Sequence, residues 1–264
     1  MPQGSVLGPM LFDVFINDLF FHIKCVKLNA YADGEQLYDS DIDPAELEKR
    51  LLWELNTANK RYNNTGMIVN PEKHHAMVLG TTNYKLSLPV KNSMELFGMT
   101  IDTEMNFKEH LATICKKINS RYGAMTRFGK LVSSDTLLGL YKAFILPYFY
   151  YCSTAWYFCN TRDSDKLKTL KKRILGFIFK DAVSDYTQLF KRTGTTTLDN
   201  RRLQNTVLNT FKCLHLHGYP AYMRQMFSLR SVSYSIRGSN ILSLPKPSKT
   251  SYGLNSFCYL ASKL

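Results

Sequence analysis

Asp33 is the residue whose type and position offer the clearest chemistry, in the stretch Tyr31-Ala32-Asp33-Gly34. Mg²⁺ and Mn²⁺ prefer oxygen ligands, and a pair of such ions roughly 3.5–4 Å apart needs several carboxylates. Gly34 offers no ligand, and Glu35 lies one residue further on with a longer side chain. Two-metal geometry tolerates little misplacement, so Glu35 is a poor substitute. Asp33 is therefore a candidate metal ligand that would by itself bind such an ion weakly or not at all.

A second acidic series is less convincing. Asp39, Asp41 and Asp43 begin like an EF-hand calcium loop. Pro44 stands where that loop needs glycine, however, and Arg50 where it needs glutamate. A role as helix cap explains Asp43 better. We therefore expect no calcium site here.

A short hairpin is predicted to position Asp33. Residues 26–31 alternate apolar and polar side chains, as a strand does, and residues 35–38 would form the partner strand. Asp33 and Gly34 would then form a two-residue turn, because Asp tolerates and Gly readily adopts a positive φ. The turn itself is therefore an alternative reason for an aspartate at position 33.

Two helices are predicted beside this hairpin. Residues 10–21 are apolar at most positions and predict a helix before it. After it, Asp43 is a good N-cap, Pro44 suits the first helical position, and Glu46 can reach back from the third. The sequence from Asp43 therefore predicts an amphipathic helix packed on the hairpin.

More strands are predicted further along the chain. Residues 66–69 and 76–79 are rich in strand-forming side chains on either side of a turn at Asn70-Pro71. Another strand pair is expected between residues 95 and 107. Together these elements predict a mixed region of strands and helices.

After residue 107 the chain becomes helical and basic. Apolar residues recur at helical spacing from Leu111 to Met125, and further helices are predicted from about Ser134 and over 165–179. Basic side chains are predicted away from the apolar stripes of the first and third of these helices: Lys116, Lys117, Arg121, Lys171, Lys172 and Arg173.

Several blocks of residues follow one another in a recognisable order: Pro2-Gln3-Gly4-Ser5-Val6-Leu7-Gly8-Pro9, Phe15-Ile16-Asn17-Asp18-Leu19, Tyr31-Ala32-Asp33-Gly34, Asn70-Pro71-Glu72-Lys73 and Leu96-Phe97-Gly98. Their order and spacing resemble the reverse transcriptases of non-LTR (LINE-type) retrotransposons, which carry Tyr/Phe-Ala-Asp-Asp at the hairpin. The resemblance continues through Leu146-Pro147-Tyr148 and Trp156. In Leu244-Pro245-Lys246-Pro247 it extends to the tail of jockey- and CR1-like members. So many blocks in order indicate common descent.

This resemblance implies an α+β fold. Residues 1–107 would be the C-terminal part of a polymerase palm, an antiparallel sheet with helices. Residues 108–180 would be a basic, α-helical thumb, and residues 181–264 a helical and irregular tail.

The resemblance also implies roles for individual residues. Pro2, Gln3 and Gly4 would lie beside the templating base and the nucleotide, and Lys73 near the triphosphate of a dNTP. Leu96-Phe97-Gly98 would be the primer grip. The basic helix residues named above would contact the backbone of an RNA template and DNA primer. The alternatives are an N-terminal loop, a solvated lysine and an ordinary hairpin.

The same resemblance argues against polymerase activity in this chain alone. In the family, a first catalytic aspartate and the fingers precede the block at Pro2, and Gly34 replaces the last aspartate of the turn. We therefore expect an inactive reverse transcriptase fragment. Two alternatives stay open: a non-catalytic nucleic-acid-binding fragment that uses the basic thumb, and a translated relic without function.

Charge is distributed unevenly along the 264 residues, whose formal net charge is +13. Residues 1–60 hold 5 Lys and Arg against 10 Asp and Glu, while the remainder holds 29 against 11. A basic surface suits phosphate backbones, although membranes and acidic partners attract it too.

The uncharged run 143–161 contains Pro147 and several tyrosines, which favours a buried helix over a membrane span. Scattered cysteines predict free thiols in an intracellular compartment, nuclear or cytoplasmic.

Overall fold

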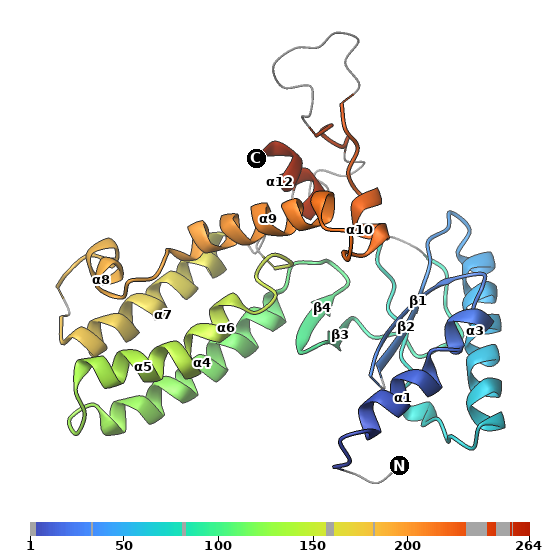
Figure 1. Cartoon of the computed structure of the whole chain (residues 1–264), viewed down its shortest axis with the longest axis horizontal. Helices are drawn as coiled ribbons and strands as arrows, with labels where there is room; N and C mark the ends of the chain where they lie inside the picture. Colours follow the sequence, from blue (N-terminus) through green and yellow to red (C-terminus); the bar gives the residue numbers. More distant parts are fainter. Residues whose placement is uncertain are drawn as a thin grey trace. The chain divides into compact units, whose positions relative to one another are not determined.

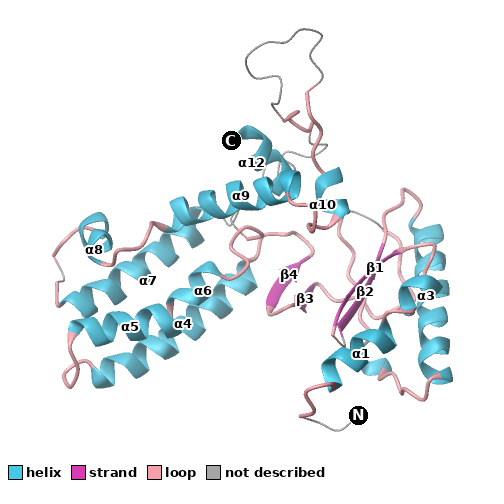
Figure 2. Ribbon diagram, in the orientation of Figure 1, coloured by secondary structure: helices cyan, strands magenta, loops and turns pink. Residues whose placement is uncertain are grey.

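The structure is a computed structural model, and it describes residues 4–32, 34–80, 83–156, 161–181, 183–230, 242–246, 254 and 256–264. The chain forms two compact units, Met1–Asn92 and Ser93–Leu264. Each unit combines helices with one two-stranded antiparallel sheet in its described part (Figures 1 and 2). The predicted α+β class is confirmed.

The first unit is built from α1 (Gly8–Ile16), α2 (Leu19–His22), β1 (Lys27–Tyr31), β2 (Gly34–Tyr38), α3 (Pro44–Asn64) and the 3₁₀ turn η1 (Pro71–Lys73). The helix predicted over 10–21 is thus divided in two. Asp18 stands at the break and pairs with Arg61 of α3, while Leu19 is buried. A polar side chain at the break is consistent with a break in an apolar run.

Helix α3 starts where the sequence predicts. The Asp43 carboxylate accepts a hydrogen bond from the Ala45 amide at 2.9 Å, and Pro44 follows at the first turn. Ala58 and Tyr62 of α3 are buried in the core of this unit. Leu28 and Leu37 of the β1–β2 hairpin pack against the same core. The hairpin therefore rests on α3 through apolar contacts.

The strands predicted over 66–69 and 76–79 do not form, so this part of the prediction is wrong. Asn70 caps the turn η1 by accepting a hydrogen bond from the Glu72 amide. Ala76 makes a single parallel bridge with Val90 instead of an antiparallel ladder. Strand-forming residues need a partner strand of matching register, and the turn that was to supply it is a 3₁₀ turn.

The second unit begins with β3 (Ser93–Leu96) and β4 (Met99–Asp102) and continues as helices: α4 (Lys108–Phe128), α5 (Ser134–Phe144), α6 (Leu146–Tyr150), α7 (Thr161–Phe179), α8 (Tyr186–Arg192), α9 (Leu198–His215), α10 (Ala221–Gln225) and α12 (Phe257–Lys263). The helices predicted over 111–125 and 165–179 are confirmed as parts of α4 and α7. In the predicted tail, 181–264, the described residues form α8, α9, α10 and α12, while residues 231–241 and 247–253 lie outside the described part.

Helices α4, α5, α6 and α7 share one hydrophobic core, with Ile118, Tyr141, Phe149 and Ile174 fully buried. The helix predicted from Ser134 stops at Phe144 and restarts as α6. Pro147 lies in the first turn of α6, and a proline there lacks the N–H that a continuous helix would need. Within the described residues, no helix is both long and apolar enough to cross a bilayer.

Candidate functional site

The β1–β2 hairpin brings Tyr31 opposite Gly34 as the last pair of the ladder. Gly34 therefore lies in the ladder, whereas the sequence predicted it in the turn with Asp33. Ala32 takes the left-handed backbone with φ of 52°, and Gly34 is the first residue of β2. The register, set by the facing Leu28 and Leu37, overrides the turn preference of an Asp-Gly pair. Asp33 itself lies outside the described residues.

The backbone does not require glycine at position 34. Gly34 has no left-handed φ, unlike Gly4 or Gly66. A Cβ atom built on it would meet only the Tyr31 carbonyl oxygen, at 3.4 Å, within 4 Å. An aspartate side chain could start from this position without moving the hairpin. The hairpin backbone is therefore compatible with either glycine or a carboxylate residue at this position.

Glu35 is the carboxylate beside Gly34, and α3 engages it. Its side chain is half-buried and accepts a hydrogen bond from the Tyr62 hydroxyl. Burial raises the pKa of Glu35 to about 7, although the nearby Arg61 guanidinium acts in the opposite direction. A carboxyl that is partly protonated at neutral pH and already hydrogen-bonded is a weak ligand for a hard cation.

The donors around the turn therefore do not fit a pair of divalent ions. Gly34 contributes no oxygen, and Glu35 faces Tyr62. Elsewhere among the described residues, no three His, Cys, Asp or Glu side chains gather where they could hold one ion.

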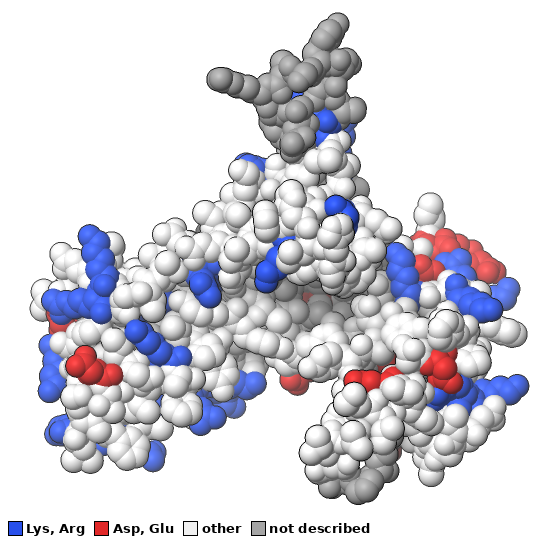
Figure 3. Space-filling view, in the orientation of Figure 1, with Lys and Arg blue, Asp and Glu red and all other residues white. Residues whose placement is uncertain are grey.

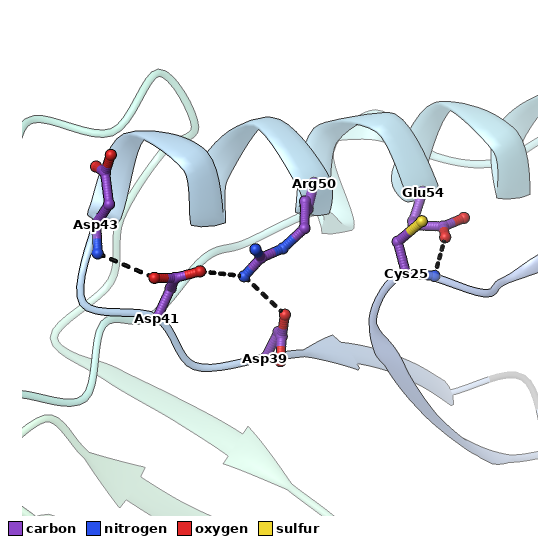
Figure 4. Close-up of polar contacts among 6 residues, drawn as sticks. All are labelled: Cys25, Asp39, Asp41, Asp43, Arg50 and Glu54. Carbon is purple, nitrogen blue, oxygen red and sulfur yellow. Dashed lines mark hydrogen bonds and ion pairs between the residues drawn. The ribbon is translucent and has the colours of Figure 1, made fainter.

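The acidic series after β2 fixes the connection to α3. Arg50 donates to the Asp39 carboxylate at 3.0 Å and to the Asp41 carboxylate at 2.7 Å (Figure 4). The hydrogen bond from the Asp43 amide, followed by the Arg50 contact, holds the pKa of Asp41 below its usual value. Arg50, which argued against an EF-hand loop, therefore neutralises Asp39 and Asp41, two of the carboxylates that had suggested one.

The strand before the turn is tied to the same helix. Glu54 of α3 is almost fully buried and accepts hydrogen bonds from the amides of Lys24 at 2.9 Å and Cys25 at 2.5 Å (Figure 4). These contacts fix the chain directly before β1. No local pattern in the sequence reveals them, because the partners are about thirty residues apart.

The other predicted site residues in the first unit are exposed or lie outside the described residues. Pro2 and Gln3 are not described, and Gly4 is exposed with φ of 86°. Lys73 is exposed at the end of η1. Their predicted roles toward template and nucleotide stay predictions.

The predicted primer-grip segment forms the turn between β3 and β4. Leu96 pairs with Met99, so Phe97 and Gly98 form a two-residue turn with φ of 50° and 74°. Two positive φ values are typical of the type I′ turn that matches strand twist. The Tyr151 hydroxyl donates to the Phe97 carbonyl oxygen at 2.5 Å. The turn is therefore held by the chain that follows α6.

A buried histidine ties this hairpin to α4. The His110 Nδ1 atom accepts a hydrogen bond from the Thr100 amide at 3.2 Å. Burial, reinforced by the charge of Lys117, lowers the pKa of His110, so the ring is neutral and can accept. Its ring also meets Trp156 edge to face, with centroids 6.1 Å apart. Sequence reasoning did not single out His110, because its partners come from other elements.

The basic residues predicted to contact nucleic acid divide into two groups. Five are exposed or half-buried on α4 and α7: Lys116, Lys117, Arg121, Lys172 and Arg173. Lys171 is fully buried, so its predicted place on an exposed face is wrong. On α7 Lys171 adjoins the apolar stripe of Leu167, Leu170 and Ile174. The buried face of the helix is wider than this predicted stripe and includes Lys171.

Lys171 is enclosed by aromatic rings. Its ammonium lies 4.3 Å from the ring centroid of Phe190 and 5.7 Å from those of Phe149 and Tyr150. Within the described residues Nζ finds no hydrogen-bond acceptor. Burial, with the nearby charge of Arg202, lowers the pKa of Lys171 to about 7.

The two units differ in charge. The first holds 9 Lys and Arg against 11 Asp and Glu, and the second 25 against 10. On the face drawn in Figure 3, Lys and Arg side chains are scattered over the helices of the second unit, where acidic side chains are sparse. This surface favours an anionic partner.

Comparison with known families places part of the chain. Residues 1–119 match the family model described as reverse transcriptase (RNA-dependent DNA polymerase). No curated protein and no solved structure matches the chain significantly. The matched residues include the Tyr31–Gly34 turn, Lys73, the β3–β4 hairpin and the first half of α4. This part of the chain is therefore reverse transcriptase-like, and members of that family use divalent metal ions and bind nucleic acid.

Proposed function

We propose that this chain is a reverse transcriptase-like fragment of the non-LTR type that binds nucleic acid and does not extend primers by itself. The observation that carries the proposal is Gly34, which stands where the resembling enzymes have a carboxylate, in a hairpin whose backbone could accommodate one. Glu35, the neighbouring carboxylate, is held by Tyr62.

The geometry of the turn supports the lack of polymerase activity. Two-metal nucleotidyl transfer needs carboxylates on both ions, and the turn retains Asp33 alone. Asp33 would bind Mg²⁺ or Mn²⁺ weakly. Gly34 cannot hold a second ion, so the triphosphate of a dNTP would lack its metal partner. In this proposal Asp33 is the one remaining metal ligand of a former two-metal site.

Other residues keep the roles that the resemblance implies. In this proposal residues 1–107 are palm, 108–180 thumb and 181–264 tail. Gly4 and the residues before it lie beside the templating base, Lys73 near the nucleotide triphosphate, and Phe97 and Gly98 at the primer. The firm attachment of the β3–β4 turn to Tyr151 and His110 suits a segment that must hold a strand end in place.

Nucleic-acid binding rests on the second unit. Its exposed cations on α4 and α7 can neutralise phosphates of an RNA template and a DNA primer, and each neutralised phosphate releases counterions. We expect binding that weakens steeply with salt. Absence of binding to any nucleic acid at low salt contradicts the proposal and leaves a translated relic.

A primer-extension assay tests the lack of activity. The full chain is incubated with an RNA template, a labelled DNA primer and dNTPs, in Mg²⁺ and separately in Mn²⁺. We expect no extended product. Extension that Asp33→Ala abolishes, and that Glu72→Ala at an exposed position leaves unchanged, overturns the proposed inactivity.

A further inference from the structure

We propose that the groove between α4 and α7 is a binding site for single-stranded nucleic acid. The inference rests on the proposed function and gives it a place and an occupant. The groove has a volume of about 680 Å³ and lies within the second unit. Helices α4 and α7 pack against each other there.

Helical periodicity brings the lining residues together. Tyr122, Thr126 and Lys130 recur at intervals of four along α4 and the turn that follows it. On α7, Thr169, Lys172, Arg173 and Gly176 share one face, and Lys180 follows directly after the helix. The run from 171 to 173 is therefore divided, because Lys171 enters the core while its two neighbours line the groove.

The rim of the groove is cationic, with Lys130, Lys172, Arg173 and Lys180. None of these four forms an ion pair with a carboxylate within the described residues, whereas other cations of the same unit do. Asp181 also lines the groove, but its carboxylate is engaged by Ser184 and by Arg192. The groove therefore presents positive charge that the protein itself does not neutralise.

The floor of the groove is aromatic. Tyr122 and Phe177 meet edge to face with centroids 5.7 Å apart, and the Arg173 guanidinium lies 5.2 Å from the Tyr122 ring centroid. Gly129 makes room for Phe177, since a Cβ atom there would lie 2.2 Å from the ring. A ring fixed in this way gives a rigid apolar floor.

A single strand fits this combination better than a duplex. Aromatic rings between cations are the usual platform for unpaired bases, because every base has a face that can stack while lysines follow the phosphates. In a duplex the bases already stack on one another, and only the phosphates would reach the rim.

Fluorescence anisotropy with a labelled 20-nucleotide oligo(U) tests the groove, using the full chain. Lys130→Glu with Lys180→Glu reverses one exposed charge on each side of it. The matched control, Lys142→Glu with Lys212→Glu, reverses two exposed charges that do not line it. We expect about a 10- to 100-fold loss of affinity in the groove variant, a lower salt dependence, and a small change in the control.

Replacement of the floor separates stacking from charge. Tyr122→Leu keeps the net charge and an apolar side chain, and we expect about a 10-fold loss for oligo(U) because a stacking surface is removed. Circular dichroism melting verifies that each variant is folded. A Tyr122→Leu protein that binds oligo(U) as the wild type does overturns the stacking part of the inference.

Competitors identify the occupant. Two competitors are tested, an RNA–DNA duplex of the same length and phosphatidylserine vesicles. If either binds the chain more tightly than oligo(U) does, and the groove variant loses affinity for it, the single-strand inference is overturned. Equal losses in the groove and control variants overturn the site while nucleic-acid binding, and so the proposed function, survives. Absence of binding to every nucleic acid removes both.

Discussion

The two units use charged side chains in opposite ways. In the first, carboxylates such as Glu48 and Glu54 are buried and saturated with hydrogen bonds, and they fasten loops to α3. In the second, cations outnumber acids, and those on the α4–α7 groove stay exposed without acidic partners among the described residues. Charge is part of the architecture where it is buried and is available for a ligand where it is exposed.

The strongest test of this contrast is Glu54→Ala. The change removes a buried carboxylate and leaves the amides of Lys24 and Cys25 without their acceptor, so we expect the first unit to lose about 2–4 kcal/mol of unfolding free energy. Urea denaturation measures it. Glu46→Ala is the control, because Glu46 is exposed and its ion pair with Lys49 is exposed too, and it should change stability by less than about 0.5 kcal/mol. Equal effects from the two variants contradict an architectural role for Glu54.

Lys171 departs from this pattern in the second unit, because it is fully buried and forms no ion pair within the described residues, and Lys171→Met sharpens the comparison. Removing a buried charge in favour of an apolar side chain should stabilise the unit by about 1–4 kcal/mol near pH 7. Thermal melting and urea denaturation measure the gain. Lys172→Met, at a half-buried position lining the groove, is the control.

The same lysine predicts a dependence of stability on pH. Its pKa falls from an ordinary value of 10.5 to about 7 on folding, so between these values the unfolded chain binds more protons than the folded one. Unfolding free energy should therefore rise as pH increases from 7 toward 10.5. Lys171→Met should flatten that rise, and an unchanged slope in the variant shows that Lys171 is not its source.

Glu35 gives a smaller effect of the opposite sign in the first unit. Its pKa rises from 4.5 to about 7 on folding, so the folded chain binds the extra proton between these values and stability falls as pH increases through them. Glu35→Gln should remove this fall and gain about 1 kcal/mol at pH 8 while keeping an acceptor for Tyr62. Titration of the Glu35 carboxyl by NMR measures the pKa directly, and a value near 4.5 contradicts the prediction.

Sequence alone predicted the features that depend on neighbouring residues. The start of α3 at Asp43-Pro44 and the apolar face of α4 follow from local capping and periodicity, and both are confirmed. The strands over 66–69 and 76–79 are wrong because a strand exists only with its partner. Gly34 lies in β2 and not in the predicted turn, because register, a property of two strands together, decides its place.

The candidate site shows the same division. The motif located the hairpin and the residue that lacks a carboxylate, yet the contacts that hold the hairpin, such as Glu54 to Lys24, join residues distant in sequence. Lys171 was misplaced for a related reason. Its position on α7 adjoins both the apolar stripe and the basic face, and only the packing of Phe190 against it decides between them.

Gly34→Asp should have the smallest effect on stability. It tests whether an added carboxylate in the first unit can bind a metal ion instead of holding the fold together. The backbone at position 34 accepts a Cβ atom with one contact at 3.4 Å, and a strand residue other than glycine restricts the unfolded chain. Repulsion from Asp33 opposes this gain, so unfolding free energy without metal should change by less than about 0.5 kcal/mol. With both carboxylates present, Mn²⁺ should raise the melting temperature of the variant more than that of the wild type, because an ion that binds only the folded state stabilises it. Gly218→Asp, at an exposed glycine outside the hairpin whose φ is not positive, controls for added charge. If Mn²⁺ raises the wild type and Gly34→Asp equally, the missing carboxylate is not what limits metal binding at this turn.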